Sequence, residues 1–519
     1  MLPKLKTQSG PGRVAMGGFG GLDRRPGAGP GAVSAMENMS ADAAPALTAR
    51  PPRRTLRSLN GTAHGVFAAG EDLLSAEGTA LYVNGAPAAG TLSDTDKVFA
   101  ALGERVVIFP DKLLWTAAGG LEPLEAACTA SGLVFSDGSY AGVPAERNTI
   151  TTAGDPFPFR VGDAVSIPAC APTGGEEKTA VVREMSADGR QLRFYENTFA
   201  ANGSVSGALT LRRSVPDLDF LCVNENRVWG CRGDTVCCCK PGDPCNWNVF
   251  DGLSTDAWQG GTGTAGAFTG CVSFLGYPVF FKEERIFKVY GDKPANFELM
   301  SSATRGVRAG AAASLAVAGE ALHYLSRDGF VRYGGGLPQS VDAALFARYA
   351  AAAGGSDGRR YYVSALRDDG AAELLVLDAG TGAWHRSDGL AVKSFANVAG
   401  TLVAQTATAL VALTGAAGTA ESFTASVTLS DLASDLPASK YPTRLWLRLD
   451  NAAAVTAAVA YDGGDFIAAA TVPAGHRSAR GFPMPLRRCD RFALRLTGPA
   501  PWTLHGLAVE TRTEGTRRR

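Results

Sequence analysis

The densest group of potentially reactive side chains in this sequence is a cluster of cysteines. Structural zinc sites usually combine two cysteine pairs at a spacing such as CxxC, and the chain contains no CxxC. Successive side chains of a strand point to opposite faces, and a free cysteine packs like a small apolar residue. The pattern therefore favours packing inside a strand, with a metal or redox role as the alternative. The cluster consists of Cys231, Cys237, Cys238, Cys239 and Cys245.

Two short motifs could suggest ligand binding. A GxGxxG pattern occurs at Gly261, Gly263 and Gly266, but a strand-like run follows it where a nucleotide-binding fold needs a helix. With 63 glycines in 519 residues, about one such match is expected by chance. An RGD triplet at Arg232–Asp234 lies between two apolar runs. We predict a loop for the first motif and a hairpin turn for the second.

Histidines and tryptophans are scattered along the chain. No HExxH or HxH motif is present, and no GxSxG nucleophile elbow is expected. We therefore predict no catalytic, cofactor-binding or metal-binding residues, no cofactor, and a protein that is not an enzyme. A carboxylate pair for glycoside hydrolysis has no fixed spacing in a sequence, so a propeller glycosidase or lyase stays an alternative. The histidines are His64, His323, His385, His476 and His505, and the tryptophans, spread as for repeated packing positions, are Trp115, Trp229, Trp247, Trp258, Trp384, Trp446 and Trp502.

The elements that position these residues follow from the composition. Apolar residues make up 45% and charged residues 19% of the chain, as in globular proteins. The high glycine content and 28 prolines favour many turns and short strands over long helices. The N-terminus has no apolar signal region, and the longest uncharged run, 394–420, is too polar to span a membrane. We predict an all-β protein with reduced thiols and no membrane insertion.

Charge is unevenly distributed, although the net charge is zero. Residues 1–60 hold nine Lys/Arg and three Asp/Glu, and residues 437–519 hold thirteen and six. The middle of the chain is therefore acidic. This pattern argues against a general polyanion-binding protein, because such proteins carry a net positive charge.

A repeated pattern of short strands and tight turns runs through most of the chain. Segments 220–244, 271–294 and 314–336 each contain an apolar run, a two- or three-residue turn, a second apolar run, a charged turn and a third run. Repetition of such a unit every 30–45 residues is typical of a β-propeller, in which each sheet buries its faces against its neighbours. We predict six or seven blades.

These patterns also suggest domain boundaries. We predict a small β-barrel inserted in a blade loop and a C-terminal β-sandwich, where apolar and polar residues alternate with period two. The predicted regions are a Gly/Pro-rich basic N-terminal arm at 1–60, the first part of the propeller at 61–150, the inserted domain at 151–212, the second part of the propeller at 213–420, and the sandwich with a basic tail at 421–519.

Seven blocks of sequence stand out by their length and unusual composition. They are ENMSADAAPALTARPPRR (37–54), VFAALGERVVIFPDKLLW (98–115), RFYENTF (193–199), SVPDLDFLCVNENRVWGC (214–231), GDPCNWNVFDGLSTDAW (242–258), GYPVFFKEERIFKVYGDKP (276–294) and RRCDRFALRL (487–496). Together they resemble a family of bacteriophage and prophage virion proteins that are labelled packaged-DNA stabilisation or tail-conduit proteins. The resemblance covers most of residues 34–512, and GDPCNWNVFDG and FFKEERIFKVYGDKP are its most specific parts.

The resemblance implies a structural protein of the phage neck or tail, made in the host cytoplasm and located in the virion. Copies would form a homo-oligomeric ring that contacts the portal, its adaptor and other tail proteins. Double-stranded DNA would pass through the ring without specific contacts, and an acidic wall would let it slide, whereas a basic wall would retain phosphates. A host-surface carbohydrate-binding propeller of a phage tail is the first alternative function.

Overall fold

The computed structural model describes most of the chain as two compact units. One unit is Asn60–Ala312, and the other combines Met1–Leu59 with Ala313–Arg519. His476 and the basic tail at 515–519 lie outside the described residues. The described ranges are 12–29, 32–40, 42–137, 148–195, 198–415, 421–432, 439–475 and 480–513.

Tight hairpins connect the short strands. Glu225 and Asn226 form one turn with φ values of 47° and 59°, and Leu275 and Gly276 form another with φ values of 53° and 81°. Positive φ at both central residues gives a turn whose twist matches the twist of the flanking strands. Glycine and asparagine adopt this conformation at low cost, which explains why a chain rich in these turns folds as strands.

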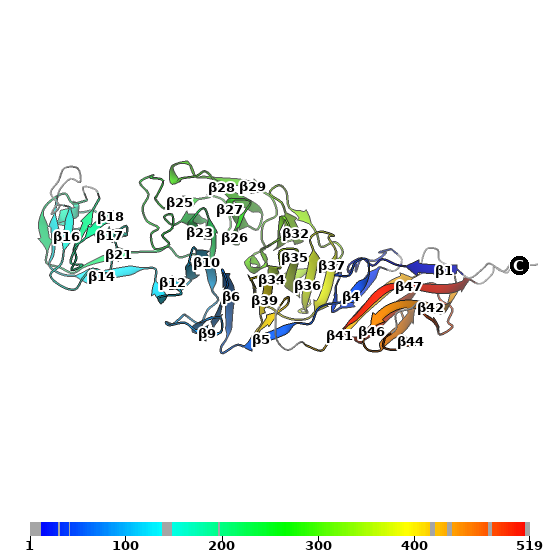
Figure 1. The fold of residues 1–519 in the computed structure, drawn as a ribbon. Coiled ribbons are helices and arrows are strands. Elements are labelled where there is room, and N and C mark those ends of the chain that lie inside the picture. Colours follow the sequence, from blue (N-terminus) through cyan, green and yellow to red (C-terminus); the bar gives the residue numbers. More distant parts are fainter. Residues whose placement is uncertain are drawn as a thin grey trace, which may run out of the picture. The chain divides into compact units, whose positions relative to one another are not determined.

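The Asn60–Ala312 unit contains four antiparallel sheets of four strands each (Figure 1). The first strands of successive sheets contact one another, and apolar side chains fill the space between neighbouring sheets, as in propeller blades. The four sheets are β6 (Ala63–Ala69), β7 (Asp72–Glu77), β8 (Ala80–Val83) and β9 (Ala86–Pro87); β10 (Val98–Leu102), β11 (Arg105–Phe109), β12 (Leu113–Thr116) and β13 (Gly120–Pro123); β22 (Phe220–Asn224), β23 (Arg227–Arg232), β24 (Thr235–Cys238) and β25 (Trp258–Gly261); and β26 (Gly270–Phe274), β27 (Tyr277–Lys282), β28 (Arg285–Tyr290) and β29 (Glu298–Ala303).

A small β-domain is inserted between β13 and β22. Its strands pair in the order β14-β21-β17-β18-β19-β16-β15-β20 around a core of its own that includes Phe135, Phe159 and Phe194. The strands are β14 (Ala126–Ala130), β15 (Leu133–Ser136), β16 (Thr149–Thr151), β17 (Ala164–Ile167), β18 (Lys178–Met185), β19 (Gln191–Phe194), β20 (Gly203–Val205) and β21 (Leu209–Arg213).

The second unit contains three more four-stranded sheets. In the last of these, the outer strand β5 comes from the N-terminal region and pairs with β40, so residues far apart in sequence complete one blade. The sheets are β30 (Ala316–Ala318), β31 (Ala321–Ser326), β32 (Gly329–Tyr333) and β33 (Gln339–Ser340); β34 (Tyr349–Ser356), β35 (Arg360–Arg367), β36 (Ala372–Asp378) and β37 (Trp384–Asp388); and β38 (Ser394–Val398), β39 (Thr401–Gln405), β40 (Ala409–Ala412) and β5 (Arg54–Ser58).

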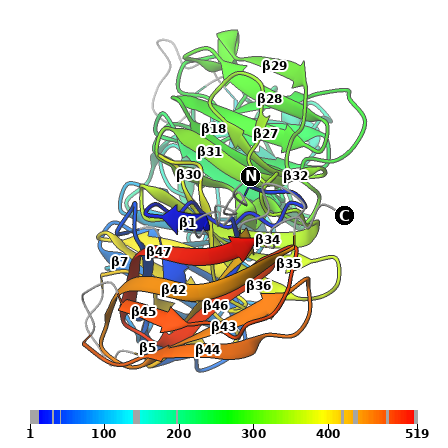
Figure 2. The same ribbon diagram turned by 90° about the vertical axis from the view of Figure 1, so that its right-hand side faces the viewer.

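A β-sandwich completes this unit, and its two sheets are built jointly from N-terminal and C-terminal strands (Figure 2). One sheet has the order β3-β4-β47-β42-β45, with β1 also pairing with β47, and the other has the order β2-β41-β46-β43-β44. The strands are β1 (Gly12–Met16), β2 (Val33–Glu37), β3 (Met39–Ser40), β4 (Leu47–Ala49), β41 (Thr424–Leu432), β42 (Lys440–Asn451), β43 (Val455–Tyr461), β44 (Ile467–Val472), β45 (Arg480–Pro483), β46 (Phe492–Pro499) and β47 (Trp502–Thr513).

The predicted fold class is confirmed: the protein is all-β, with propeller blades, an inserted small β-domain and a C-terminal sandwich. Of the two predicted blade counts, the described residues support seven, since they form seven four-stranded sheets. The described helices are three single 3-10 turns, and none has the length or the apolar character needed to cross a membrane. These turns are Ala171–Thr173, Pro294–Asn296 and Ala312–Ser314.

Candidate functional site

A cavity with a volume of about 60 Å³ and an open mouth lies within the second unit. It is bounded by the sheet β34–β37, by the end of β40 and by the arm segment that connects β3 to β5. A volume of this size holds a few water molecules or part of a small ligand, so a larger ligand would also occupy the mouth. The lining residues are Met39, Ser40, Arg50, Pro51, Arg53, Arg360, Tyr362, Leu374, Val376, Asp378, His385, Ser387, Leu413 and Thr414.

One face of the sheet β34–β37 forms the floor. Tyr362, Val376 and His385 are direct neighbours across three adjacent strands, because Tyr362 pairs with Val376 and Val376 pairs with His385. Alternate residues of a strand point to the same face, which brings Leu374 and Asp378 to the cavity on either side of Val376. The cavity floor is therefore apolar in the middle and polar at its ends.

A β-bulge shapes the wall next to His385. Leu374 pairs with Asp388 and Leu375 pairs with Arg386, so Ser387 is an extra residue in β37. Bulges redirect the side chains that follow them and are frequent beside binding sites. Asp388 lies directly after the bulge and contacts the arm.

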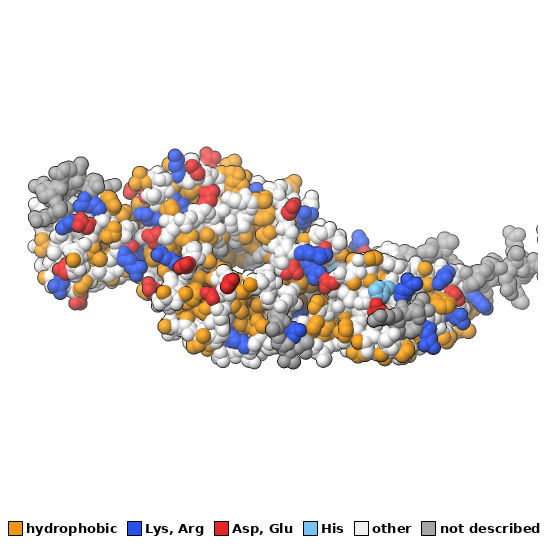
Figure 3. All heavy atoms as spheres, viewed as in Figure 1, with side chains coloured by type: hydrophobic (Ala, Val, Ile, Leu, Met, Phe, Trp, Pro, Cys, Tyr) orange, Lys and Arg blue, Asp and Glu red, His pale blue; other side chains and the backbone are white. Residues whose placement is uncertain are grey.

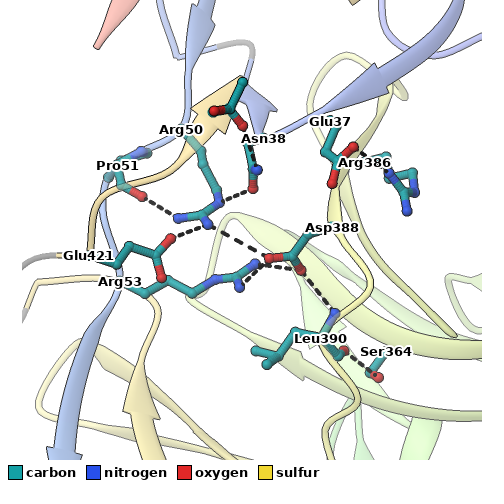
Figure 4. A network of polar contacts seen from close by, with 11 residues as sticks. Glu37, Asn38, Arg50, Pro51, Arg53, Ser364, Arg386, Asp388, Leu390 and Glu421 are labelled. Carbon is teal, nitrogen blue, oxygen red and sulfur yellow. Dashed lines mark hydrogen bonds and ion pairs between the residues drawn. The ribbon is translucent and has the colours of Figure 1, made fainter. Parts of the chain in front are cut away.

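Two arginines of the arm meet the carboxylate of Asp388 (Figure 4). Arg53 donates two hydrogen bonds to Asp388, at 2.6 and 3.0 Å, and is 6% exposed. Arg50 lies between Asp388 and Glu421, and its Nε donates to Oδ1 of Asn38 at 2.8 Å. Both guanidinium groups are thus held by carboxylates from the unit itself.

The remaining charges at the cavity are also matched. Arg360 forms an ion pair with Asp42. Asp378 accepts hydrogen bonds from Arg359 and from the backbone N–H groups of Gly380 and Thr381, each at 3.0 Å. Each arginine that lines the cavity therefore has a carboxylate partner, and the cavity wall is close to neutral.

The pKa shifts of Asp378 and Asp388 keep both side chains charged at neutral pH. Burial opposes ionisation of both Asp378 and Asp388. The backbone hydrogen bond from Thr381 and the charge of Arg359 nevertheless lower the pKa of Asp378, and the hydrogen bond from Arg53 lowers that of Asp388. Both carboxyl groups are therefore anions, and neither is a proton donor at neutral pH.

His385 differs from its neighbours because its Nε2 is buried and has no hydrogen-bond partner among the described residues. The side chain is 4% exposed and lines the cavity. Burial lowers the pKa of His385 to about 4, although the charge of Asp378 acts in the opposite direction. An interaction with the backbone of Ala383 also raises the pKa, but burial outweighs it, so the ring is neutral at pH 7.

The residues singled out in the sequence lie elsewhere, apart from His385. Cys237 and Cys239 pack toward the sheet β10–β13, whereas Cys231 and Cys238 pack toward the sheet β26–β29. Cys245 packs against the first of these clusters. All ten cysteines are free thiols, and the described residues contain no group of His, Cys, Asp or Glu arranged to hold a metal ion.

The glycine and RGD motifs form turns. Gly261 ends β25, and Gly263 and Gly266 follow with positive φ before strand β26. Arg232–Asp234 spans the hairpin between β23 and β24, with Gly233 at a φ of 57°.

The other described histidines and most tryptophans have structural surroundings. His64 lies between Asp94 and Asp96, His505 contacts Asp450, and His323 stacks on Tyr361. The buried tryptophans are Trp115, Trp229, Trp247, Trp384 and Trp502.

The site residues Arg50, Arg53, Arg360, Asp378 and Tyr362 carried no signal that identified them beforehand. The alternation of cavity residues along β35 and β36 is visible in the sequence, but the same alternation occurs in every blade. The contribution of the arm depends on contacts between residues more than 300 positions apart, such as that between Arg53 and Asp388.

Comparisons with known proteins match the chain only by structure. No protein-family model and no curated protein matches it. It is similar to the computationally designed protein Ika8, with 11% identity over 69% of this chain and 99% of that chain and a TM-score of 0.34. It is also similar to the phage phi92 endosialidase, with 11% identity over 72% and 70% and a TM-score of 0.25. For an exo-β-1,3-galactanase from Phanerochaete chrysosporium, the values are 12%, 74%, 100% and 0.17.

These comparisons correct the prediction that the chain is not an enzyme, because the similar structures include glycoside hydrolases and an endosialidase. The prediction rested on the absence of catalytic motifs in the sequence. That inference fails for enzymes that act on sugars, because their paired carboxylates come from separate strands and loops and leave no fixed spacing.

Proposed function

We propose that this protein is a β-propeller protein of a bacteriophage tail that recognises carbohydrate on the host surface, and that the cavity beside His385 is its binding site. The phage assignment is supported by the resemblance of the blocks at 242–258 and 276–294 to phage virion proteins. The assignment of carbohydrate is supported by the chemistry of the cavity.

A single observation carries the proposal: a neutral, partly apolar cavity is lined by His385, whose buried Nε2 has no hydrogen-bond partner among the described residues. Sugars combine apolar C–H faces with hydroxyl groups that donate and accept hydrogen bonds. The floor offers Tyr362, Val376 and Leu374 to the C–H face of a sugar ring, and His385 offers an acceptor to a hydroxyl. Small-molecule sites generally combine an apolar lining with a few placed polar groups.

The ionisation states favour binding over cleavage at this cavity. Glycoside hydrolysis by the usual mechanism needs one carboxyl group that is protonated and can donate to the leaving oxygen. Asp378 and Asp388 are both held as anions by their partners. We therefore assign recognition to this cavity, and glycan cleavage by the whole chain is measured in the same experiment.

A cavity-filling variant tests the proposal. The purified chain is applied to an array of bacterial surface glycans, and the affinity for each bound glycan is measured by calorimetry. Val376→Phe fills the cavity and should abolish binding, at a stability cost of about 1–3 kcal/mol for overpacking. Val317→Phe makes the same change at a side chain that is 40% exposed in β30 and should leave binding unchanged.

Two outcomes would contradict the proposal. The first is the absence of binding to any arrayed glycan, and the second is binding that Val376→Phe leaves intact. Release of reducing sugar during incubation would show cleavage. If it persisted in Val376→Phe, the catalytic centre would lie away from this cavity.

The connector function predicted from the sequence is a second candidate. The uneven charge supports it, since the sequence is basic at both ends and acidic between them, and Lys and Arg side chains are visible on the sandwich surface (Figure 3). Basic surfaces would contact acidic neighbours such as the portal or its adaptor in a ring. Negative-stain imaging should then show rings, and a chain that stays monomeric in the presence of portal protein would exclude this candidate.

A further inference from the structure

An open cavity of about 800 Å³ lies in the Asn60–Ala312 unit. Its walls are the loop 263–269, which joins β25 to β26, the hairpin 282–285 between β27 and β28, the side of Phe220, and the segment 309–310. A volume of this size is within the range of sites that enclose a small molecule. The loop contains the second and third glycines of the GxGxxG motif, so a motif that binds no nucleotide here nevertheless forms a cavity wall.

Lys282 holds this loop in place from inside the protein. Its side chain is 4% exposed, and its ammonium group donates to the carbonyl of Thr264 at 2.8 Å and to the hydroxyls of Thr262 and Thr264 at 2.9 Å. Asp234 pairs with Lys282 and accepts a hydrogen bond from the N–H of Gly263 at 2.8 Å. The wall is therefore preorganised, which lowers the entropic cost of binding a ligand.

The loop supplies backbone hydrogen-bond donors. The N–H groups of Ala265, Gly266 and Ala267 have no acceptor among the described residues. All three residues are exposed and line the cavity. Their small side chains leave the backbone accessible, so three adjacent N–H groups at this wall are available to oxygen atoms of a ligand.

The hairpin supplies charged groups of both signs. Arg285 is half-buried and lines the cavity, and its guanidinium has no hydrogen bond or ion pair with the described residues. Glu283 accepts a hydrogen bond from the N–H of Ala309 at 3.1 Å through Oε1 and also lines the cavity. A guanidinium only donates hydrogen bonds and a carboxylate only accepts them, so the cavity offers both functions to a ligand.

This balance of charge disfavours a charged ligand. An anion attracted by Arg285 would be repelled by Glu283 and Glu284, and a cation attracted by the two glutamates would be repelled by Arg285. A hydroxyl group both donates and accepts, so a ligand rich in hydroxyls can satisfy either kind of group without adding charge. The half-buried ring of Phe220 adds an apolar surface, which matches the C–H face of a sugar.

We propose that this cavity is a second carbohydrate site, which binds an uncharged oligosaccharide. Arg285, Glu283 and the N–H groups of residues 265–267 bond to the sugar hydroxyls, and Phe220 contacts the C–H face of a ring. The inference rests on the proposed function only in that the protein recognises glycans, and it assigns a site in the other unit.

Two variants and two matched controls test the site on the same glycan array. Ala265→Trp places a large ring at the cavity wall, and Arg285→Ala removes the unpaired guanidinium. Each should weaken the binding of at least one neutral glycan by roughly tenfold or more. The controls are Ala201→Trp, at an exposed alanine of the inserted domain, and Arg105→Ala, at an exposed arginine that also lacks an ion-pair partner among the described residues. Both controls should bind as the wild type does.

Hydrogen exchange of the backbone amides locates the bound glycan. Exchange is followed by mass spectrometry with and without the neutral glycan that binds most tightly. The glycan should slow exchange in peptides that cover residues 263–268 of the wild type, and it should not do so in Ala265→Trp. An unchanged unfolding temperature of Ala265→Trp shows that the variant is folded, and Arg285→Ala tests the site without adding bulk.

The outcomes separate this proposal from the proposed function. Binding of every glycan that is unchanged in both Ala265→Trp and Arg285→Ala would overturn the second site and leave the cavity beside His385 to the test with Val376→Phe. Binding that survives in Val376→Phe but is lost in Ala265→Trp would support the second site and contradict the location given in the proposed function. A preference for glycans with uronic acids that disappears in Arg285→Ala would overturn the uncharged class of ligand. Failure of every arrayed glycan to bind would overturn both proposals.

Discussion

Lys282 in one unit and His385 in the other are both buried polar residues. They differ in whether hydrogen bonds within the protein compensate for their burial. The Lys282 side chain is 4% exposed, and its ammonium group donates to Asp234, to the hydroxyls of Thr262 and Thr264, and to the carbonyl of Thr264, all within 2.9 Å. His385 is equally buried, but its Nε2 has no partner among the described residues.

The two residues differ in whether their hydrogen-bonding capacity is satisfied inside the protein. Every donor of Lys282 is used inside the protein, so the residue fixes the position of the glycine-containing loop around Gly263. An unused acceptor in a cavity wall is costly to folding unless something else supplies a donor. The degree of hydrogen-bond satisfaction is therefore a better guide to a binding site here than burial.

The largest loss of stability is expected for Asp388→Ala, which removes the carboxylate that the cavity arginines Arg50 and Arg53 share. Arg53 and Arg50 are 6% and 8% exposed, and Arg53 would lose the carboxylate that binds both of its terminal nitrogens. Removing one partner of a buried pair usually costs about 3–5 kcal/mol. Chemical unfolding should show this loss in the transition of the second unit.

Asp369→Ala is the matched control for that variant. Asp369 also pairs with an arginine, Arg367, but it is 57% exposed. An exposed ion pair contributes about 0–1 kcal/mol. Equal losses of unfolding free energy in the two variants would show that burial of the cavity arginines has no energetic consequence. This result would contradict the view that the ion pairs with Asp388 stabilise the cavity wall.

The second largest loss of stability is expected for Asp234→Ala, which removes the carboxylate partner of Lys282. Asp234 is 42% exposed, but Lys282 is buried and would keep only its threonine partners. Losing a hydrogen bond to a charged group costs about 1.5–3 kcal/mol. The unfolding transition of the Asn60–Ala312 unit should shift by this amount. Asp219→Ala, at an exposed ion pair with Arg232, should shift it little.

The propeller and sandwich were predictable because they depend on local patterns. The turns at Glu225–Asn226 and Leu275–Gly276 are encoded by adjacent residues, and the period-two alternation of β42 appears directly in the sequence. The alternation of Cys237, Cys238 and Cys239 between two faces follows from the same rule.

The candidate site was not predictable because its parts are distant in the sequence and chemically common. Arg53 reaches Asp388 only because β5 joins the blade that contains β40, and nothing in the sequence around Arg53 specifies that pairing. His385 could be named as a histidine, but its lack of a partner depends on the whole cavity. The bulge at Ser387, which directs Asp388 toward the arm, carries no glycine or proline that would mark it.

Acidification should destabilise the second unit because two of its histidines are buried. Burial lowers the pKa of both His385 and His323 to about 4 from an ordinary value near 6.5. The unfolded chain binds protons below pH 6.5 while the folded chain does not, so stability falls as the pH drops from 6.5 toward 4. Each histidine should contribute a loss of about 2 kcal/mol at pH 5 relative to pH 7.

The measurement is the unfolding free energy at pH 7 and pH 5 for the wild type and the His323→Phe/His385→Phe double variant. The double variant should lose less stability between the two values by up to about 4 kcal/mol. The same slope in both proteins would show that these rings take up protons in the folded state, and would contradict their burial as neutral acceptors.

The smallest effect is expected for the reactivity of the buried thiols, which need no hydrogen-bond partner. Burial raises the pKa of Cys238 to about 12, so only about 10⁻⁴ of this thiol is ionised at pH 8. Cys238 should therefore resist iodoacetamide in the folded protein, whereas the partly exposed Cys128 should be alkylated faster. Peptide mass spectrometry after timed alkylation measures both rates. Rapid labelling of Cys238 in a sample whose Cys237 and Cys239 stay protected would mean that the face packed against the sheet β26–β29 is open to solvent, and that the cysteine cluster does more than fill the core.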